Sequence, residues 1–217
     1  MRKTLIGLAA LAMASSANAA VVVNFVQGAS PLSAGFTVFE NFEGYTNGQL
    51  LAGATNARAY SATQVGTAAR PAFNSTGNFG AALGGAPSSY TVNFGPTRAF
   101  SFVLGSLDTY NSLTLLFSNG TTQTFNGAQI ALGADADGNQ VQADSNGRVS
   151  YTAQAGDPSI VGATFGSTGF SFEFDDLATL ANSPVPEPAT WAMFLLGFGI
   201  AGRAMRRRKT LGVAAFS

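Results

Sequence analysis

The side chains that could carry chemistry in this 217-residue chain are almost all carboxylates, because the sequence contains no histidine and no cysteine. These absences remove the commonest general base, thiol catalysis, disulfides and cysteine-based zinc sites. Paired carboxylates can hydrolyse glycosides when about 5 to 9.5 Å separates them across a cleft. The one obvious pair is Asp175 and Asp176, whose side chains point to opposite faces if a strand continues through them. We therefore expect no enzymatic activity.

A second acidic sequence, Asp135-x-Asp137-Gly138-Asn139, has the spacing that begins a calcium-binding loop. It lacks the later acidic residue that completes an EF-hand loop. A polar loop is therefore the simpler interpretation of this segment.

Charge is strongly segregated along the chain, although the formal net charge is zero. Seven of the eleven basic residues lie in the first three positions and in the segment 203–209. Residues 20–184 carry four arginines, no lysine and ten acids, which is a net charge of −6. An acidic body repels phosphate backbones, so we expect no nucleic-acid partner.

The elements that must position these acids are short apolar runs with period-two alternation, which is typical of strands. Many short strands and no convincing soluble helix predict an all-β domain, specifically a β-sandwich with a jelly-roll topology. Between residues 53 and 87 we expect long loops with one or two short strands. The predicted strands are 21–25, 36–42, 90–94, 99–104, 112–117, 121–125, 140–143, 148–153, 160–165 and 170–174.

The turn residues and the alternation give more local predictions. Asn119-Gly120 and Asn146-Gly147 predict hairpins with type I′ turns, which need positive φ at both central residues. Gly95-Pro96 predicts a turn between two strands. Within 170–174 the three phenylalanines are expected to face the core, whereas Ser171 and Glu173 are expected to face solvent.

The N-terminal residues have the three parts of a secretory signal peptide. Met1-Arg2-Lys3 is cationic, residues 4–13 are apolar, and Ala17 and Ala19 form an Ala-x-Ala cleavage site. The alternative is a buried N-terminal helix. Such a helix would need neither the cationic start, nor an apolar run of this length, nor the small residues after it, whereas a signal peptide needs all three. We therefore predict a signal peptide over residues 1–19 and a mature protein that starts at Ala20.

The C-terminal residues combine a proline-spaced acid, an apolar run and a cationic end. The apolar run, 189–202, would form a helix of roughly 21 Å, which is short of the roughly 30 Å of hydrocarbon in a bilayer. Met205 and snorkelling arginine stems could extend it, and the basic residues would stay in the cytoplasm. The alternative is an amphipathic helix packed on a domain, but the run is apolar all round. The cationic end consists of Arg203, Arg206, Arg207, Arg208 and Lys209.

The order Pro186-Glu187-Pro188, then Trp191-Ala192, then the apolar run and the arginines resembles the PEP-CTERM sorting signal of the PEPxxWA subtype. The resemblance covers residues 184–209 only, and the tail 210–217 departs from the family, which usually ends at the arginines. It implies export and processing by an exosortase near Pro-Glu-Pro, with Trp191 as an interfacial anchor. The chain would then be membrane-anchored before processing and afterwards lie at the cell surface or outside the cell.

The predicted domain, residues 20–183, is similar to the bodies of exosortase-dependent bacterial surface proteins. Its acids also resemble those of jelly-roll carbohydrate-binding modules, in which the first and last strands hold a structural calcium ion through oxygen ligands. By this resemblance Glu40, Glu43, Asp175 and Asp176 are the candidate calcium ligands. The alternative is that these acids are solvated side chains at a strand end.

Two functions follow as hypotheses. The first is a non-enzymatic surface or matrix protein with a structural or adhesive role in an exopolysaccharide-associated biofilm. The second is a carbohydrate-binding module with a structural calcium ion, which would need exposed aromatic rings for sugars to stack on. The candidates with a polar edge are Tyr45, Tyr60, Tyr110 and Tyr151.

Overall fold

The computed structural model describes residues 21–84, 88–180, 193, 195–198, 202, 203 and 205. The chain divides into two units, Met1–Asn182 and Ser183–Ser217. The predicted signal peptide, with its cleavage residues Ala17 and Ala19, lies outside the described residues.

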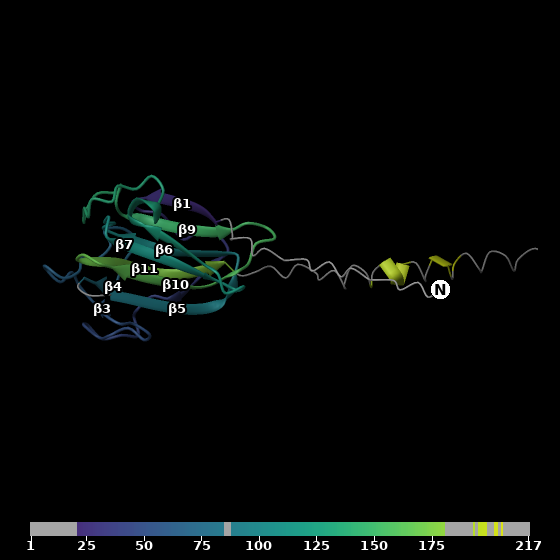
Figure 1. The fold of residues 1–217 in the computed structure, drawn as a ribbon, viewed down its shortest axis with the longest axis horizontal. Helices are drawn as coiled ribbons and strands as arrows, with labels where there is room; N and C mark the ends of the chain where they lie inside the picture. Colours follow the sequence, from purple (N-terminus) through teal and green to yellow (C-terminus); the bar gives the residue numbers. More distant parts are fainter. Residues whose placement is uncertain are drawn as a thin grey trace, which may run out of the picture. The chain divides into compact units, whose positions relative to one another are not determined.

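The described part of the first unit is built from strands and one short 3-10 helix (Figure 1). The strand predictions for the second half of the chain are largely confirmed, and two short strands do form within 53–87 as expected. The elements are β1 Val21–Gln27, β2 Phe36–Glu40, β3 Ala57–Tyr60, β4 Phe79–Leu83, β5 Ser88–Thr97, β6 Ala99–Gly105, β7 Asn111–Phe117, β8 Thr122–Asn126, η1 Gly127–Gln129, β9 Gly147–Ala153, β10 Ile160–Ser167 and β11 Ser171–Leu180.

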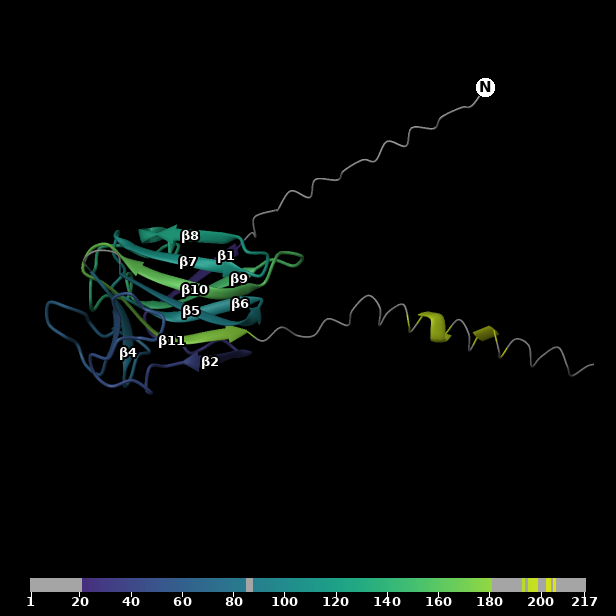
Figure 2. The ribbon, with the colours of Figure 1, turned by 60° about the horizontal axis from the view of Figure 1, so that its bottom comes forward.

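The strands form two antiparallel sheets, which confirms the β-sandwich. The larger sheet has the order β1-β9-β6-β11-β4-β3, with β2 also paired to β11, and the smaller sheet has the order β5-β10-β7-β8. Figure 2 shows the strands of the smaller sheet following one another from β8 to β5. The four-strand sets β4-β11-β6-β9 and β5-β10-β7-β8 are those of a jelly roll made of two Greek keys. The predicted topology is therefore confirmed, with β1, β2 and β3 as additions to the larger sheet.

The described chain enters and leaves the larger sheet at one end. Val21 of β1 pairs with Ala153 of β9, and Ala99 of β6 pairs with Thr152 beside it. Leu180, the last residue of β11, pairs with Ala99. The first residue of β1 and the last residue of β11 therefore lie at the same end of the sheet. We call the opposite end, where the loops after β4, β6 and β10 lie, the distal end.

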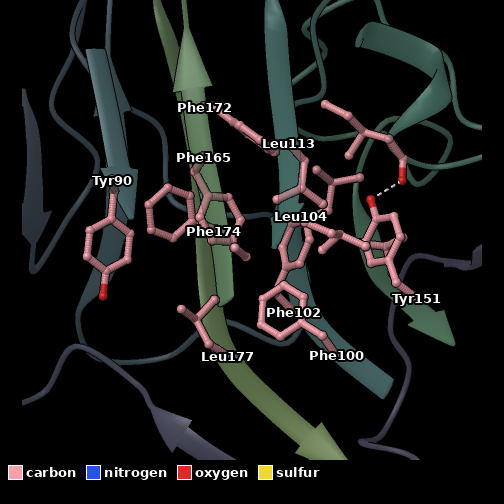
Figure 3. Close-up of a cluster of buried hydrophobic side chains, with 14 of the residues drawn as sticks. Tyr90, Phe100, Phe102, Leu104, Leu113, Tyr151, Phe165, Phe172, Phe174 and Leu177 are labelled. Atoms are coloured by element: carbon pink, nitrogen blue, oxygen red, sulfur yellow. Dashed lines mark hydrogen bonds between the residues drawn. The ribbon is translucent and has the colours of Figure 1, made fainter. Parts of the chain in front are cut away.

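Aromatic rings pack together at the centre of the core between the sheets (Figure 3). The ring of Phe165 from β10 lies 4.1 Å from that of Phe174 and 5.6 Å from that of Phe172, both on β11. It also meets Phe102 of β6 edge-on at 5.0 Å. Such ring pairs add about 0.5–1.5 kcal/mol each beyond the area that they bury. Phe165 therefore joins the two sheets at their centre.

Residues 61–78, which we call the covering segment, cover the part of the outer face of the larger sheet that lies over β11 and β6. Its Ala69 N–H donates a hydrogen bond to Glu173 of β11. Its Pro71 packs against Gly105 of β6 so closely that a Cβ on this glycine would lie 2.9 Å from the proline ring. Side chains that alternation assigns to solvent are consequently buried. The prediction that Ser171 and Glu173 face solvent is wrong, because a chain segment 100 residues upstream replaces the water.

The prediction for Phe170 is also wrong. Its side chain is 73% exposed, because Phe170 precedes the first residue of β11 and therefore lies beyond the end of the sheet. Only Phe172 and Phe174 of the three phenylalanines enter the core.

Three turn predictions need correction as well. The β7–β8 hairpin forms, but only Gly120 of its turn has positive φ, and Asn119 instead accepts a hydrogen bond from Thr121 N–H. This arrangement is a type I turn with a glycine bulge. No strand forms at 140–143 among the described residues, so Asn146-Gly147 is not a hairpin turn. Strand β5 continues through Gly95-Pro96 to Thr97, and the chain changes sheets at Arg98.

Phe165→Ala should lower the free energy of unfolding by about 3–5 kcal/mol, because it removes a fully buried ring and leaves a cavity between the sheets. Chemical denaturation measures this change. Phe39→Ala is the matched control, since Phe39 is 41% exposed, and it should cost much less. Equal losses in the two variants would contradict the central place of Phe165.

Candidate functional site

The sorting residues can be placed only in small part. Arg203 lies in a helical stretch and is exposed. Within the part of the chain that the structure describes, no helix has the length and apolar character needed to cross a membrane. The other predicted sorting residues lie outside the described residues: Pro186, Glu187, Pro188, Trp191, Ala192, Arg206, Arg207, Arg208 and Lys209.

The two glutamates proposed as calcium ligands each accept a backbone hydrogen bond. Glu40 at the end of β2 accepts from the Phe42 N–H at 2.7 Å. Glu43 accepts from the Asn78 N–H at 2.8 Å, at the end of the covering segment. Glu40 therefore stabilises the local turn after β2, whereas Glu43 joins that region to the covering segment.

The adjacent aspartates lie at an irregularity in β11. The pairing of β11 with β6 shifts between Asp175 and Ala178, and Asp176 has a φ of 45°. Asp175 accepts a hydrogen bond from Ser75 Oγ at 2.6 Å, whereas Asp176 pairs with Arg148 at 3.5 Å. The strand does not continue regularly through these residues. Burial lowers the pKa of Arg148, and the charges of both aspartates partly oppose this fall.

The structure brings together part of the predicted calcium set. Leu177 of β11 pairs with Glu40 at the end of β2. The pKa of Asp175 is raised to about 7, mainly by burial and to a smaller extent by the charges of Asp176 and Glu43. The first and last strand regions of the body therefore do converge here. No group of three or more acidic side chains suited to a metal ion occurs among the described residues. Calcium binding at Glu40, Glu43, Asp175 and Asp176 stays a prediction.

Glu173 is as deeply buried as Asp175, with 2% of its surface exposed. It accepts hydrogen bonds from Ala69 N–H at 3.0 Å, from Ser106 Oγ at 2.8 Å and from Ser171 Oγ. Burial raises the pKa of Glu173, and the three hydrogen bonds oppose that rise. This carboxylate ties the covering segment to the loop after β6, which contains Ser106.

Glu173 also forms the floor of a hollow at the distal end. The hollow has a volume of about 300 Å³ and is lined by Asp108, Asp137, Gln140 and Phe170, among others. Asp108 and Asp137 form an isolated β-bridge, so the Asp135–Asn139 loop that resembled a calcium loop is one wall of this hollow. Sequence reasoning did not predict the hollow, because its walls come from loops far apart in the chain.

Of the four tyrosines that the sequence suggested as rings for sugar stacking, Tyr45 and Tyr110 are partly exposed and the other two are buried. Tyr60 and Tyr151 are buried, and the Tyr151 hydroxyl donates to the carbonyl of Ile130 in the core (Figure 3). Tyr110 is half-buried and donates a hydrogen bond to Asp108 at 2.5 Å. Burial, followed by this hydrogen bond, raises the pKa of Tyr110 above its usual value. The exposed aromatic ring beside it is that of Phe170.

Glu173→Gln should change the pH dependence of stability in a defined direction. Because the folded-state pKa of Glu173 is raised, the wild type loses stability as the pH rises above the ordinary carboxyl range of about 4 to 5. The glutamine has no such loss. Between pH 4 and pH 8, the unfolding free energy of the variant should therefore increase relative to that of the wild type, as measured by urea denaturation.

Asp135→Asn, which changes an exposed carboxylate, is the control and should leave the profile unchanged. A Glu173→Gln profile parallel to that of the wild type would show that Glu173 titrates normally.

Comparison with known proteins finds one family model that matches the chain. Residues 184–209 match the model described as the PEP-CTERM protein-sorting motif. A search of curated proteins finds no match. The match lies entirely after β11, so it leaves the β-sandwich outside it. The chain therefore carries a PEP-CTERM protein-sorting motif at residues 184–209, as its sequence pattern predicted.

Proposed function

We propose that this is a non-enzymatic protein of the cell surface or extracellular matrix, with a structural or adhesive role among exopolysaccharides. The observation that supports this proposal is the sorting motif at residues 184–209, which implies export and processing by an exosortase. The membrane would hold the C-terminal apolar run before processing, and the β-sandwich would be displayed afterwards.

The way in which the sandwich ends supports processing without damage to the fold. Strand β11 is hydrogen-bonded along both edges up to Leu180, and the matched motif begins at Pro184. A processing enzyme needs an accessible, extended segment, and a strand inside a sheet is neither free nor accessible. Cleavage near Pro-Glu-Pro would therefore leave every described strand intact.

Replacing Pro186, Glu187 and Pro188 together by alanine should abolish sorting, because it removes the motif that the exosortase is proposed to recognise. Cell fractionation and immunoblotting should find the variant in the membrane fraction, at a larger mass than the processed wild type. Ser183→Ala, which lies just outside the match, is the control and should behave as the wild type. The proposal fails if the triple variant reaches the surface at the wild-type mass.

A structural calcium ion is a second proposal, supported by the covering segment, whose Ser75 and Asn78 donate hydrogen bonds to Asp175 and Glu43 respectively. A divalent cation would relieve the repulsion between these like charges. Calcium should then raise the midpoint of thermal unfolding by several degrees relative to EGTA. Asp175→Asn should remove this effect and Asp135→Asn should retain it. An identical midpoint of the wild type in calcium and in EGTA would exclude the ion.

A further inference from the structure

The geometry points to the distal end of the sandwich as a binding site for a neutral polysaccharide, with Phe170 as the surface on which a sugar ring stacks. This inference rests on the proposed display of the body outside the cell, and it adds the site and the ligand class. It is carried by the hollows around Phe170, by the close packing of the backbone beside it, and by the chemistry of the surrounding residues.

Phe170 is a lining residue of three hollows. The largest, about 410 Å³, lies between Phe170 and the turn that contains Val65, a side chain that is 97% exposed. The second, about 300 Å³, contains Asp108 and Gln140, and the third, about 230 Å³, contains Asn56. Together they form a site larger than one sugar unit, with apolar walls beside polar ones.

The backbone around Phe170 is held by close contacts. A Cβ on Gly169 would lie 2.4 Å from the ring of Tyr110, so that ring packs directly against the backbone. A Cβ on Gly84 would lie 1.4 Å from the Gly169 carbonyl oxygen. The segment is thus enclosed from two sides, while the Phe170 side chain itself remains 73% exposed. Because the backbone is already fixed, ordering the Phe170 ring against a ligand costs little beyond the side chain's own rotamer freedom.

The polar groups beside the ring are mainly hydrogen-bond acceptors. The carboxylate of Asp108 accepts a hydrogen bond from the Tyr110 hydroxyl at 2.5 Å. It also packs against Gly138, where a Cβ would lie 2.5 Å from the Asp108 Oδ1 atom. Asp137 and Gln140 stand on the same wall. Carboxylate and amide oxygens accept hydrogen bonds from sugar hydroxyls, while the C–H face of a sugar packs on an apolar ring.

Charge decides which polysaccharide fits. None of the described residues that line the three hollows is basic, and two aspartates and a glutamate line the second. The body itself carries a net charge of −6. An acidic polysaccharide would be repelled at this site, whereas a neutral one would not.

The position of the site also suits a displayed protein. Phe170 lies just before Ser171, the first residue of β11, whereas Leu180 at the other end of that strand leads toward the sorting motif. A ligand at the distal end would therefore not compete with processing for the same residues.

Affinity electrophoresis of the exported protein tests the inference, with native gels that contain dextran, galactomannan or a mixed-linkage β-glucan. The wild type should be retarded by at least one of these polysaccharides. Phe170→Ala should weaken that interaction by about tenfold, and Gln140→Ala should weaken it less. Phe170→Tyr keeps the ring and should bind as the wild type does. Phe39→Ala is the matched control, because it removes an exposed aromatic ring elsewhere and should leave retardation unchanged.

The contrary outcomes are equally defined. Absence of retardation of the wild type in all three gels would overturn the inference, as would stronger retardation by alginate, an acidic polysaccharide, than by the neutral ones. Equal retardation of Phe170→Ala and the wild type would overturn the assignment of binding to Phe170. Thermal unfolding of each variant verifies its fold. Normal sorting of Phe170→Ala would show that a failure of binding leaves the proposed export intact.

Discussion

Strand β11 is hydrogen-bonded along both edges, to β6 on one side and to β4 and then β2 on the other. Its inner face carries Phe172 and Phe174 into the core against Phe165. Its outer face carries Glu173 under the covering segment. One strand therefore joins the larger sheet, the core and the covering segment. Everything at the distal end, including Phe170, takes its position from where this strand begins.

The covering segment explains why a sheet with polar outer positions is still buried. A buried carboxylate is costly unless it is hydrogen-bonded, and Glu173 accepts three hydrogen bonds from the segments that bury it. Arg148 is less completely satisfied, because its Nε and one terminal nitrogen lack partners among the described residues. Its charge is balanced by Asp176. The polar layer thus fixes where the covering segment lies, at some cost in stability.

Period-two alternation and turn chemistry were enough to predict the jelly roll and most strands, because these signals are local. They failed where distant segments meet. Alternation predicts that Glu173 faces solvent, but residues 61–78 cover it in the fold. Asn146-Gly147 predicts a hairpin turn, but the Asn146 side chain instead accepts a hydrogen bond from the Ser106 N–H at 2.8 Å. The sorting motif could be predicted because its parts are contiguous in the sequence. The distal hollows could not be predicted, since the loops that line them are brought together only by the fold.

Mass spectrometry of the mature protein at the cell surface is the sharpest test of export with processing at both ends of the chain. We expect a polypeptide that begins at Ala20, retains β11 through Leu180 and ends near Pro-Glu-Pro, without the apolar run and the arginines. A surface protein with both ends intact, or one that ends within β11, would contradict this expectation.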